Sequence, residues 1–371
     1  MLLADLGVTL ALANHICLLP EGQNAEAKQI ATQTQKLASR NALISLSTFA
    51  LILCAYYFVN LRQANNGLEI ALCCFLFAIN STLQPAINIY CAAQRHQGNP
   101  DKAIYFINIG RLFELISYIV AYILFKNIAV IALIALTIRI LYCGIAISKA
   151  KKYFSQFSGA STNISVHEIT SAGRGIALAV SIQHLTLHAP IILISALINP
   201  TLAAVYSSTR TLSRVAIQPI GIGMASIQHE LTLCWGRGEF HTFKKLAILS
   251  TAASILLLFG TSVFTLFFLS EINTAWLSDK IHLPHALFVP VSLSATAQAG
   301  ILAISLSLSS INQTQKLSRL LLFGTLISMT AAYVALANAS DVVAMSYVLA
   351  ICEISLVPLL VRELCSLSIP R

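Results

Sequence analysis

The chain has 371 residues, of which 57% are hydrophobic and only 10% are charged, and its formal net charge is +9 at pH 7. A soluble domain ordinarily carries roughly 25% charged residues, so this composition excludes an ordinary soluble protein. The basic residues lie mainly between apolar runs, which indicates membrane topology and not a nucleic-acid partner.

Eleven apolar runs approach the roughly 20 residues that a helix needs to cross a bilayer. They predict an all-α polytopic membrane protein with about eleven transmembrane helices. In chain order, the predicted spans are 1–19, 41–60, 69–91, 104–125, 128–148, 175–198, 201–225, 246–270, 286–309, 320–339 and 341–362.

Basic residues are distributed unequally over the connections between these spans. The odd-numbered connections and the C-terminal tail hold sixteen Lys and Arg residues, whereas the even-numbered connections hold only Arg62, Lys126 and Lys280. Such a bias marks the cytoplasmic side of a membrane. The sequence therefore predicts a multi-pass membrane protein with a cytoplasmic C-terminus, and Met1 on the outer side or within the membrane.

A weak internal repeat relates the two halves of the chain at an offset of about 214 residues. A long fixed period is typical of transporters built from two related halves. It predicts an incomplete N-terminal lobe of about five helices at 1–148, a cytoplasmic linker at 149–174, and a C-terminal lobe of six helices at 175–371. The aligned pairs are Gly7 with Gly221, His15 with His229, Gly22 with Gly236, and Lys102 with Lys316.

Several stretches together resemble one family. They are ADLGVTLALAN at 4–14, STRTLSR at 208–214, HELTLCWGRGE at 229–239, Trp276, and INQTQK at 311–316. In this order the stretches resemble polysaccharide flippases of the Wzx type, which belong to the MOP superfamily together with the MATE exporters. His229 stands where that family usually has proline.

The resemblance implies twelve helices in two lobes around a central cavity, of which this chain lacks the first helix and part of the second. It further implies alternating access in the bacterial inner membrane that moves undecaprenyl-diphosphate-linked oligosaccharide repeat units, of O-antigen or capsule, out of the cytoplasm. Expected partners are this lipid-linked sugar, membrane lipids, a polysaccharide polymerase and chain-length proteins.

Ionisable side chains inside membrane helices are costly, so each is a candidate functional residue. Arg210 and Arg214 are expected on one face of span 201–225, where guanidinium groups could bind the diphosphate or could instead fix helix packing. Arg139 has no partner in its own span and is a further substrate-binding candidate. Arg111 either binds substrate as well or forms an ion pair with Glu114, three residues away.

Ion coupling requires groups that change charge or bind a cation. The candidates are His184 and His188, Glu114, Glu353 and Asp5, with interhelical hydrogen bonding as the alternative for the histidines. The expected driving force is a gradient of H+ or Na+. No cofactor or metal site is expected, because two histidines alone do not make a zinc site.

A polar stripe in span 69–91 contains Asn80, Gln84 and Asn88 at intervals of four residues. Asn80 and Gln84 are substrate-binding candidates, since amides could bind sugar hydroxyls. Such stripes are also common where membrane helices hydrogen-bond to one another.

The chain contains no phosphate-binding Walker loop, no G-x-S-x-G and no H-E-x-x-H, so no catalytic residue and no enzyme activity is predicted. The prediction is a flippase for lipid-linked oligosaccharides. The alternatives are a MATE-like drug/cation antiporter, a membrane-embedded polysaccharide polymerase, and a truncated remnant that does not transport.

Overall fold

The computed structural model describes residues 7–18, 24–58, 67–155, 166–277 and 283–367, and every regular element within these ranges is a helix. Helices are expected here, because a backbone surrounded by lipid must satisfy its hydrogen bonds within the segment. The chain divides into two compact units, Met1–Ala177 and Leu178–Arg371, which we call unit 1 and unit 2.

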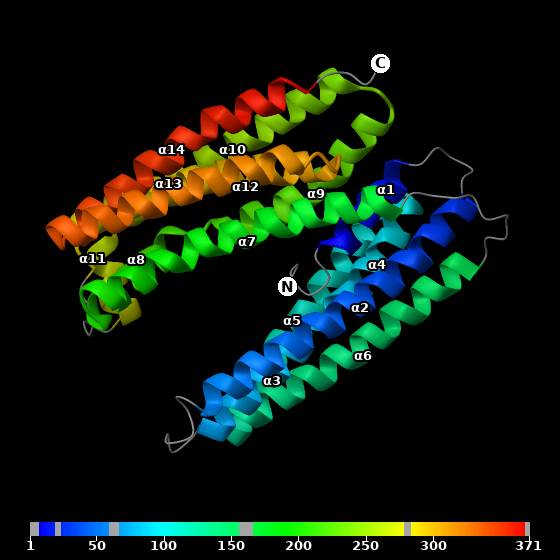
Figure 1. Ribbon diagram of the computed structural model, residues 1–371, viewed down its shortest axis with the longest axis horizontal. Coiled ribbons are helices and arrows are strands. Elements are labelled where there is room, and N and C mark those ends of the chain that lie inside the picture. Colours follow the sequence, from blue (N-terminus) through cyan, green and yellow to red (C-terminus); the bar gives the residue numbers. More distant parts are fainter. Residues whose placement is uncertain (1–6, 19–23, 59–66, 156–165, 278–282, 368–371) are drawn as a thin grey trace. The chain divides into compact units, whose positions relative to one another are not determined.

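Unit 1 is a helical bundle (Figure 1). Its buried apolar side chains form a core between the helices. Its central helix is α4, which packs against α1, α5 and α6. The run predicted as one span at 69–91 is divided at Leu83, and Pro85 stands in the first turn of α4, where a missing N–H costs nothing. The helices are α1 (Val8–Leu18), α2 (Asn24–Tyr56), α3 (Gly67–Thr82), α4 (Gln84–His96), α5 (Pro100–Phe125), α6 (Ile128–Ser155) and the start of α7 (Val166–Leu197).

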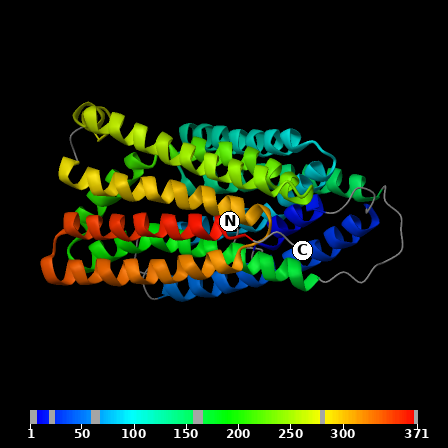
Figure 2. The same ribbon diagram turned by 90° about the horizontal axis from the view of Figure 1, so that it is seen from above.

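Unit 2 is built around α12, which contacts α8, α9, α10 and α14, while α13 packs on α14 (Figures 1 and 2). Small residues such as Ala295, Ala299 and Ala303 lie buried along α12 and allow this close packing. Besides the rest of α7, the helices are α8 (Pro200–Ser213), α9 (Ile217–Gly236), α10 (Phe240–Phe267), α11 (Leu269–Leu277), α12 (His285–Ser310), α13 (Gln315–Ala339) and α14 (Val342–Cys365).

Nine helical stretches among the described residues are long and apolar enough to cross a membrane. The predicted spans 1–19 and 201–225 are not among them. The prediction of one continuous helix at 201–225 is wrong, because α8 ends at Ser213 and α9 begins at Ile217. The predicted linker 149–174 is partly helical, since α6 extends to Ser155 and α7 begins at Val166.

The repeat at an offset of 214 residues is present in the backbone of the helix links. Gly98 after α4 and Asn312 after α12 are both left-handed, with φ of 72° and 59°. Each link also contains an equivalent backbone hydrogen bond of 3.0 Å. The N–H of Asn99 donates to the carbonyl of Gln94, and the N–H of Gln313 donates to the carbonyl of Leu308. This is the Schellman geometry that commonly ends a helix.

A second pair of links repeats in the same way, because Lys126 and Ser340 are left-handed with φ of 49° and 50°. Helix packing repeats as well. A Cβ built on Gly110 would lie 2.5 Å from the Tyr142 ring, and one built on Gly324 would lie 2.4 Å from Leu356. The helices α4, α5 and α6 therefore correspond to α12, α13 and α14.

Candidate functional site

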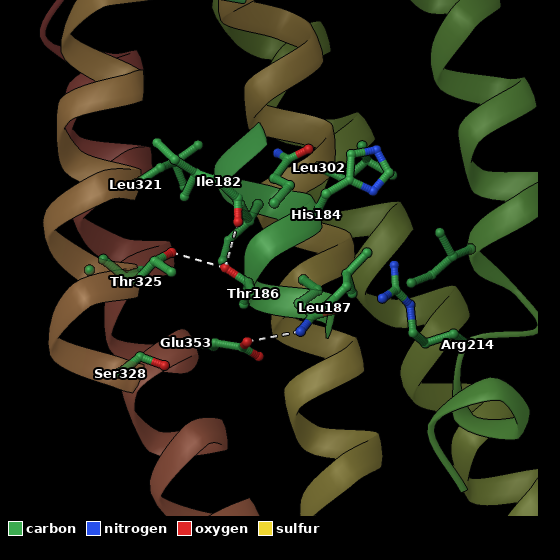
Figure 3. Close-up of a pocket in the computed structure, with 16 residues that line it drawn as sticks. Ile182, His184, Thr186, Leu187, Arg214, Leu302, Leu321, Thr325, Ser328 and Glu353 are labelled. Carbon is green, nitrogen blue, oxygen red and sulfur yellow. Dashed lines mark hydrogen bonds between the residues drawn. The ribbon is translucent and has the colours of Figure 1, made fainter. Parts of the chain in front are cut away.

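Unit 2 contains a cavity of about 220 Å³ between α7, α12, α13, α14 and the link from α8 to α9 (Figure 3). Half of the residues that line it are polar, and the others are aliphatic residues and Gly324, so polar groups converge on an otherwise apolar wall. The polar lining residues are Gln183, His184, Thr186, Arg214, Gln298, Thr325, Ser328 and Glu353.

Glu353 is the acidic residue of this cavity and is only 3% exposed. Packing of α14 on α12 brings its carboxylate to two polar side chains one helical turn apart. Ser294 Oγ donates to Oε2, and Gln298 Nε2 donates to Oε1 at 2.8 Å. Both donors are neutral, so the carboxylate is held in place without a charged partner among these contacts.

Two oxygen atoms near this acid on the cavity wall remain unsatisfied. Within the described part of the chain, Gln298 Oε1 and Ser328 Oγ are buried and have no hydrogen-bond partner. On another part of the wall, Thr186 Oγ1 and Thr325 Oγ1 bond to each other at 2.9 Å (Figure 3). A buried polar atom without a partner calls for an explanation, and a bound water, proton or ion is one.

Arg210 and Arg214 do not share a helical face as expected, because α8 ends between them. Arg210 lies in the last turn of α8, and Arg214 follows the helix as its C-cap residue. The Arg214 side chain lines the cavity (Figure 3), whereas Arg210 has a buried Nη1 without a hydrogen-bond partner among the described residues. Neither arginine takes part in an ion pair within that part of the chain.

The two histidines of α7 occupy different positions. Their rings stack with centroids 6.4 Å apart and an interplanar angle of 11°. Both side chains are exposed, but only His184 lines the cavity (Figure 3).

Unit 1 brings three further candidates together in a buried network. Arg139 is 3% exposed and forms an ion pair with Glu114 of α5 at 2.8 Å. It also donates to Gln84 Oε1. Gln84 in turn donates to Asn88 at 2.9 Å, and Asn88 donates to Thr9 of α1 at 2.9 Å. The network therefore connects α1, α4, α5 and α6.

This network decides one alternative that the sequence left open. Glu114 pairs with Arg139 and not with Arg111, which is exposed, so the alternative of an ion pair within α5 is excluded. Asn80 lies on α3, buried and with its Oδ1 unpartnered in the described chain, and the break at Leu83 separates it from Gln84. Asp5 lies outside the described residues.

The networks of the two units occupy corresponding positions. At the offset of 214, Gln84 corresponds to Gln298, Arg139 to Glu353, and Glu114 to Ser328. The glutamine thus accepts a hydrogen bond from a cation in unit 1 and donates one to an anion in unit 2. In unit 1 two opposite charges are paired, whereas in unit 2 a carboxylate lies beside a cavity.

Sequence reasoning missed Ser294, Gln298 and Ser328, the polar neighbours of Glu353. The signal was available, because the same offset applied to Asn80, Gln84 and Glu114 leads directly to these three positions.

Comparison with known proteins gives a result for the fold alone. No family model matches the sequence, and a search of curated proteins gives no match either. A solved MATE in complex with MaL6 superposes with a TM-score of 0.78 at 12% identity, covering 98% of this chain and 84% of that one.

Two further solved structures agree. A MOP superfamily transporter from Pyrococcus furiosus, described as having a binding pocket of reverse polarity, gives a TM-score of 0.74 at 14% identity, over 98% of this chain and 83% of that one. An outward-facing multidrug resistance MATE family transporter gives a TM-score of 0.73 at 14% identity, over 98% of this chain and 84% of that one.

These matches define the class of the molecule. It is an all-α, multi-pass membrane protein with the fold of MATE transporters of the MOP superfamily, as the sequence predicted.

Proposed function

We propose that the protein is a membrane transporter that works by alternating access and that responds to an ion bound in the cavity of unit 2. The fold supports this proposal, because MATE family transporters of similar fold have been solved in an outward-facing and in an inward-facing conformation. The observation that carries it is the buried Glu353 carboxylate, held by neutral donors beside unsatisfied oxygen atoms.

The chemistry of the cavity suits a hard monovalent cation or a proton. A carboxylate, an amide oxygen and a hydroxyl are ligands that hard cations prefer, and they are supplied here by Glu353, Gln298 and Ser328. These residues come from α14, α12 and α13. Binding would therefore strengthen the packing of these three helices.

The proposed substrate is a lipid-linked oligosaccharide that carries a diphosphate. Arg214 at the cavity and Arg210 one turn earlier are basic groups without an ion-pair partner in the described chain, and guanidinium binds phosphate oxygens in a bidentate manner. Arg139 is less suited to this role, because Glu114 already neutralises it. A polysaccharide polymerase and chain-length proteins remain predicted partners.

A drug/cation antiporter is the second candidate, and the acidic group in the cavity favours it. Glu353 would attract a cationic drug, as a diphosphate would be attracted by Arg214. The two candidates therefore predict opposite substrate charge.

Transport by the purified protein in vesicles distinguishes these candidates. We expect flipping of an undecaprenyl-diphosphate-linked oligosaccharide, and a decrease of about tenfold or more in the R210A/R214A variant. R111A is the control, since Arg111 is exposed and lines no part of the cavity. Wild-type rates in R210A/R214A would contradict the diphosphate assignment, and transport of ethidium alone would favour the antiporter.

The ion site is tested separately by the thermal stability of the purified protein. We expect the apparent Tm of the wild type to rise in NaCl relative to choline chloride, or on acidification if the ion is a proton. E353Q should lose either response, and S328A should lose the response to Na+. E363Q, at the end of the same helix and paired with Lys316 at 3.1 Å, should keep it. An unchanged response in E353Q would overturn the assignment.

A further inference from the structure

A second concave region lies on the surface of unit 1, between α5 and α6 and beside Tyr90 of α4. It is a groove of about 540 Å³, and it shares no residue with the network around Arg139. Its walls are apolar and include Ile109, Phe113, Leu141 and Ile145. Neighbouring exposed side chains of α5 are also apolar, as expected for a surface that faces lipid.

The floor of this groove is a stack of aromatic rings. Phe106 and Tyr142 lie with centroids 4.1 Å apart, and Tyr90 lies 4.5 Å from Phe106. The Tyr142 ring can lie against α5 only because residue 110 is glycine. A Cβ at Gly110 would approach the ring to 2.5 Å, which is closer than such atoms can pack. The glycine thus keeps the groove open.

Two lysines, Lys102 and Lys149, line one end of the groove. Lys149 Nζ lies 5.7 Å from the Phe106 ring centroid and 6.0 Å from that of Tyr90, within the range of cation–π attraction. Lys102 belongs to the first turn of α5. Neither lysine forms an ion pair within the ranges that the structure describes, and no acidic side chain lines the groove.

The two lysines lie at the depth along α5 and α6 where lipid head groups are expected. Since α5 and α6 are joined by a short link at Lys126 and pack together, the start of α5 and the end of α6 lie at the same end of the pair. At a rise of 1.5 Å per residue, Lys149 is about 30 Å along α6 from Ile128. That distance is roughly the thickness of the hydrocarbon core.

We propose that this groove binds one anionic phospholipid of the membrane. An acyl chain lies along Ile109, Phe113 and Ile145, and the lipid phosphate binds between Lys102 and Lys149. Two ammonium groups with no nearby acid in the lining favour an anionic over a zwitterionic head group. The site is distinct from the cavity of unit 2 and does not depend on the transported substrate.

Native mass spectrometry of the purified full chain tests this site. The protein is titrated with phosphatidylglycerol and with phosphatidylcholine of identical acyl chains. We expect the wild type to bind phosphatidylglycerol about tenfold or more tightly, and K102A/K149A to lose that preference. K152A is the matched control, because Lys152 belongs to the same helix end but does not line the groove.

A second variant tests the acyl-chain part without changing charge. G110A should push the Tyr142 ring into the groove and weaken binding of both lipids, while the preference between them persists. Equal binding of the two lipids by the wild type, or an unchanged preference in K102A/K149A, would overturn the proposal. Displacement of the lipid by glycerol phosphate at comparable concentration would also overturn it, since the acyl chain would then contribute nothing.

Discussion

Arg139 and Glu353 occupy corresponding places in the two units. Both side chains are buried, and they carry opposite charges. Arg139 has Glu114 as a counter-ion and Gln84 as an acceptor. Glu353 accepts hydrogen bonds from the neutral donors Ser294 and Gln298, and within the described residues it forms no ion pair, although Arg214 and Arg210 attract it from a longer distance. A buried charge that is not directly paired is costly, so the carboxylate is the group of the two that gains more from binding a cation or a proton.

Removing one partner of the ion pair in unit 1 should be strongly destabilising. Arg139→Ala leaves the Glu114 carboxylate buried without its cation, for which we expect a loss of about 3–5 kcal/mol. Glu114→Gln in the same chain should recover part of this loss, because the uncompensated charge disappears. Reversible unfolding in detergent of Arg139→Ala, Glu114→Gln and the double variant measures the coupling.

Arg111→Ala is the control for that series, with an expected change within about 0.5 kcal/mol, because Arg111 is exposed. Single changes at Arg139 and Glu114 that add without coupling would contradict the ion pair.

At the residue scale, the sequence located the ionisable candidates but not their partners. Hydropathy alone marks Arg139, Glu114 and Glu353 as costly groups within apolar runs. Their partners come from other helices, 25 residues away for the Arg139–Glu114 pair and 55 for Glu353 and Gln298. Helical spacing compares residues along one helix only, which is why Arg111 was the wrong partner for Glu114.

At the scale of elements, apolar runs predicted most membrane helices but not the breaks inside them. The link at Arg214 interrupts an apolar run that has no proline at the break itself, and Pro219 follows within α9. The polar stretch before residue 41 was predicted as a connection, yet it forms the first half of α2. Polarity excludes a segment from lipid, but it does not prevent a helix.

Close helix contacts at two glycines lead to a prediction about packing. Gly324→Ala would bring a Cβ to 2.4 Å from Leu356, and Gly110→Ala would bring one to 2.5 Å from Tyr142. We expect each change to cost about 1–3 kcal/mol of stability through overpacking. Thermal unfolding of the purified variants measures the effect.

Gly144→Ala provides a matched control in α6, because a Cβ there meets nothing within 4 Å. Its stability should equal that of the wild type or exceed it by up to about 1 kcal/mol, the helix preference of alanine over glycine. Equal effects at all three positions would show that packing at the glycines is not responsible.

At the scale of the whole molecule, the bias of basic residues predicts which ends of the helices face the cytoplasm. Cysteines introduced at Asn127 and Asn338, near the left-handed links after α5 and α13, should react with a membrane-impermeant maleimide in intact cells. Cysteines at Gln97 and Gln313 should react only after the membrane is opened. All four positions are exposed, and the native cysteines are replaced by serine for the assay. The reverse pattern would refute the predicted orientation.

A glutamine stands at corresponding positions of the two units, and it allows the residue that it contacts to differ between them. An amide carries an acceptor and two donors on one frame, so Gln84 and Gln298 can serve a guanidinium or a carboxylate without being replaced. After duplication, the facing residue could therefore reverse its charge while the buried glutamine still bonded to it. A neutral glutamine therefore allows one copy to hold a permanent ion pair and the other to hold a carboxylate that binds and releases an ion.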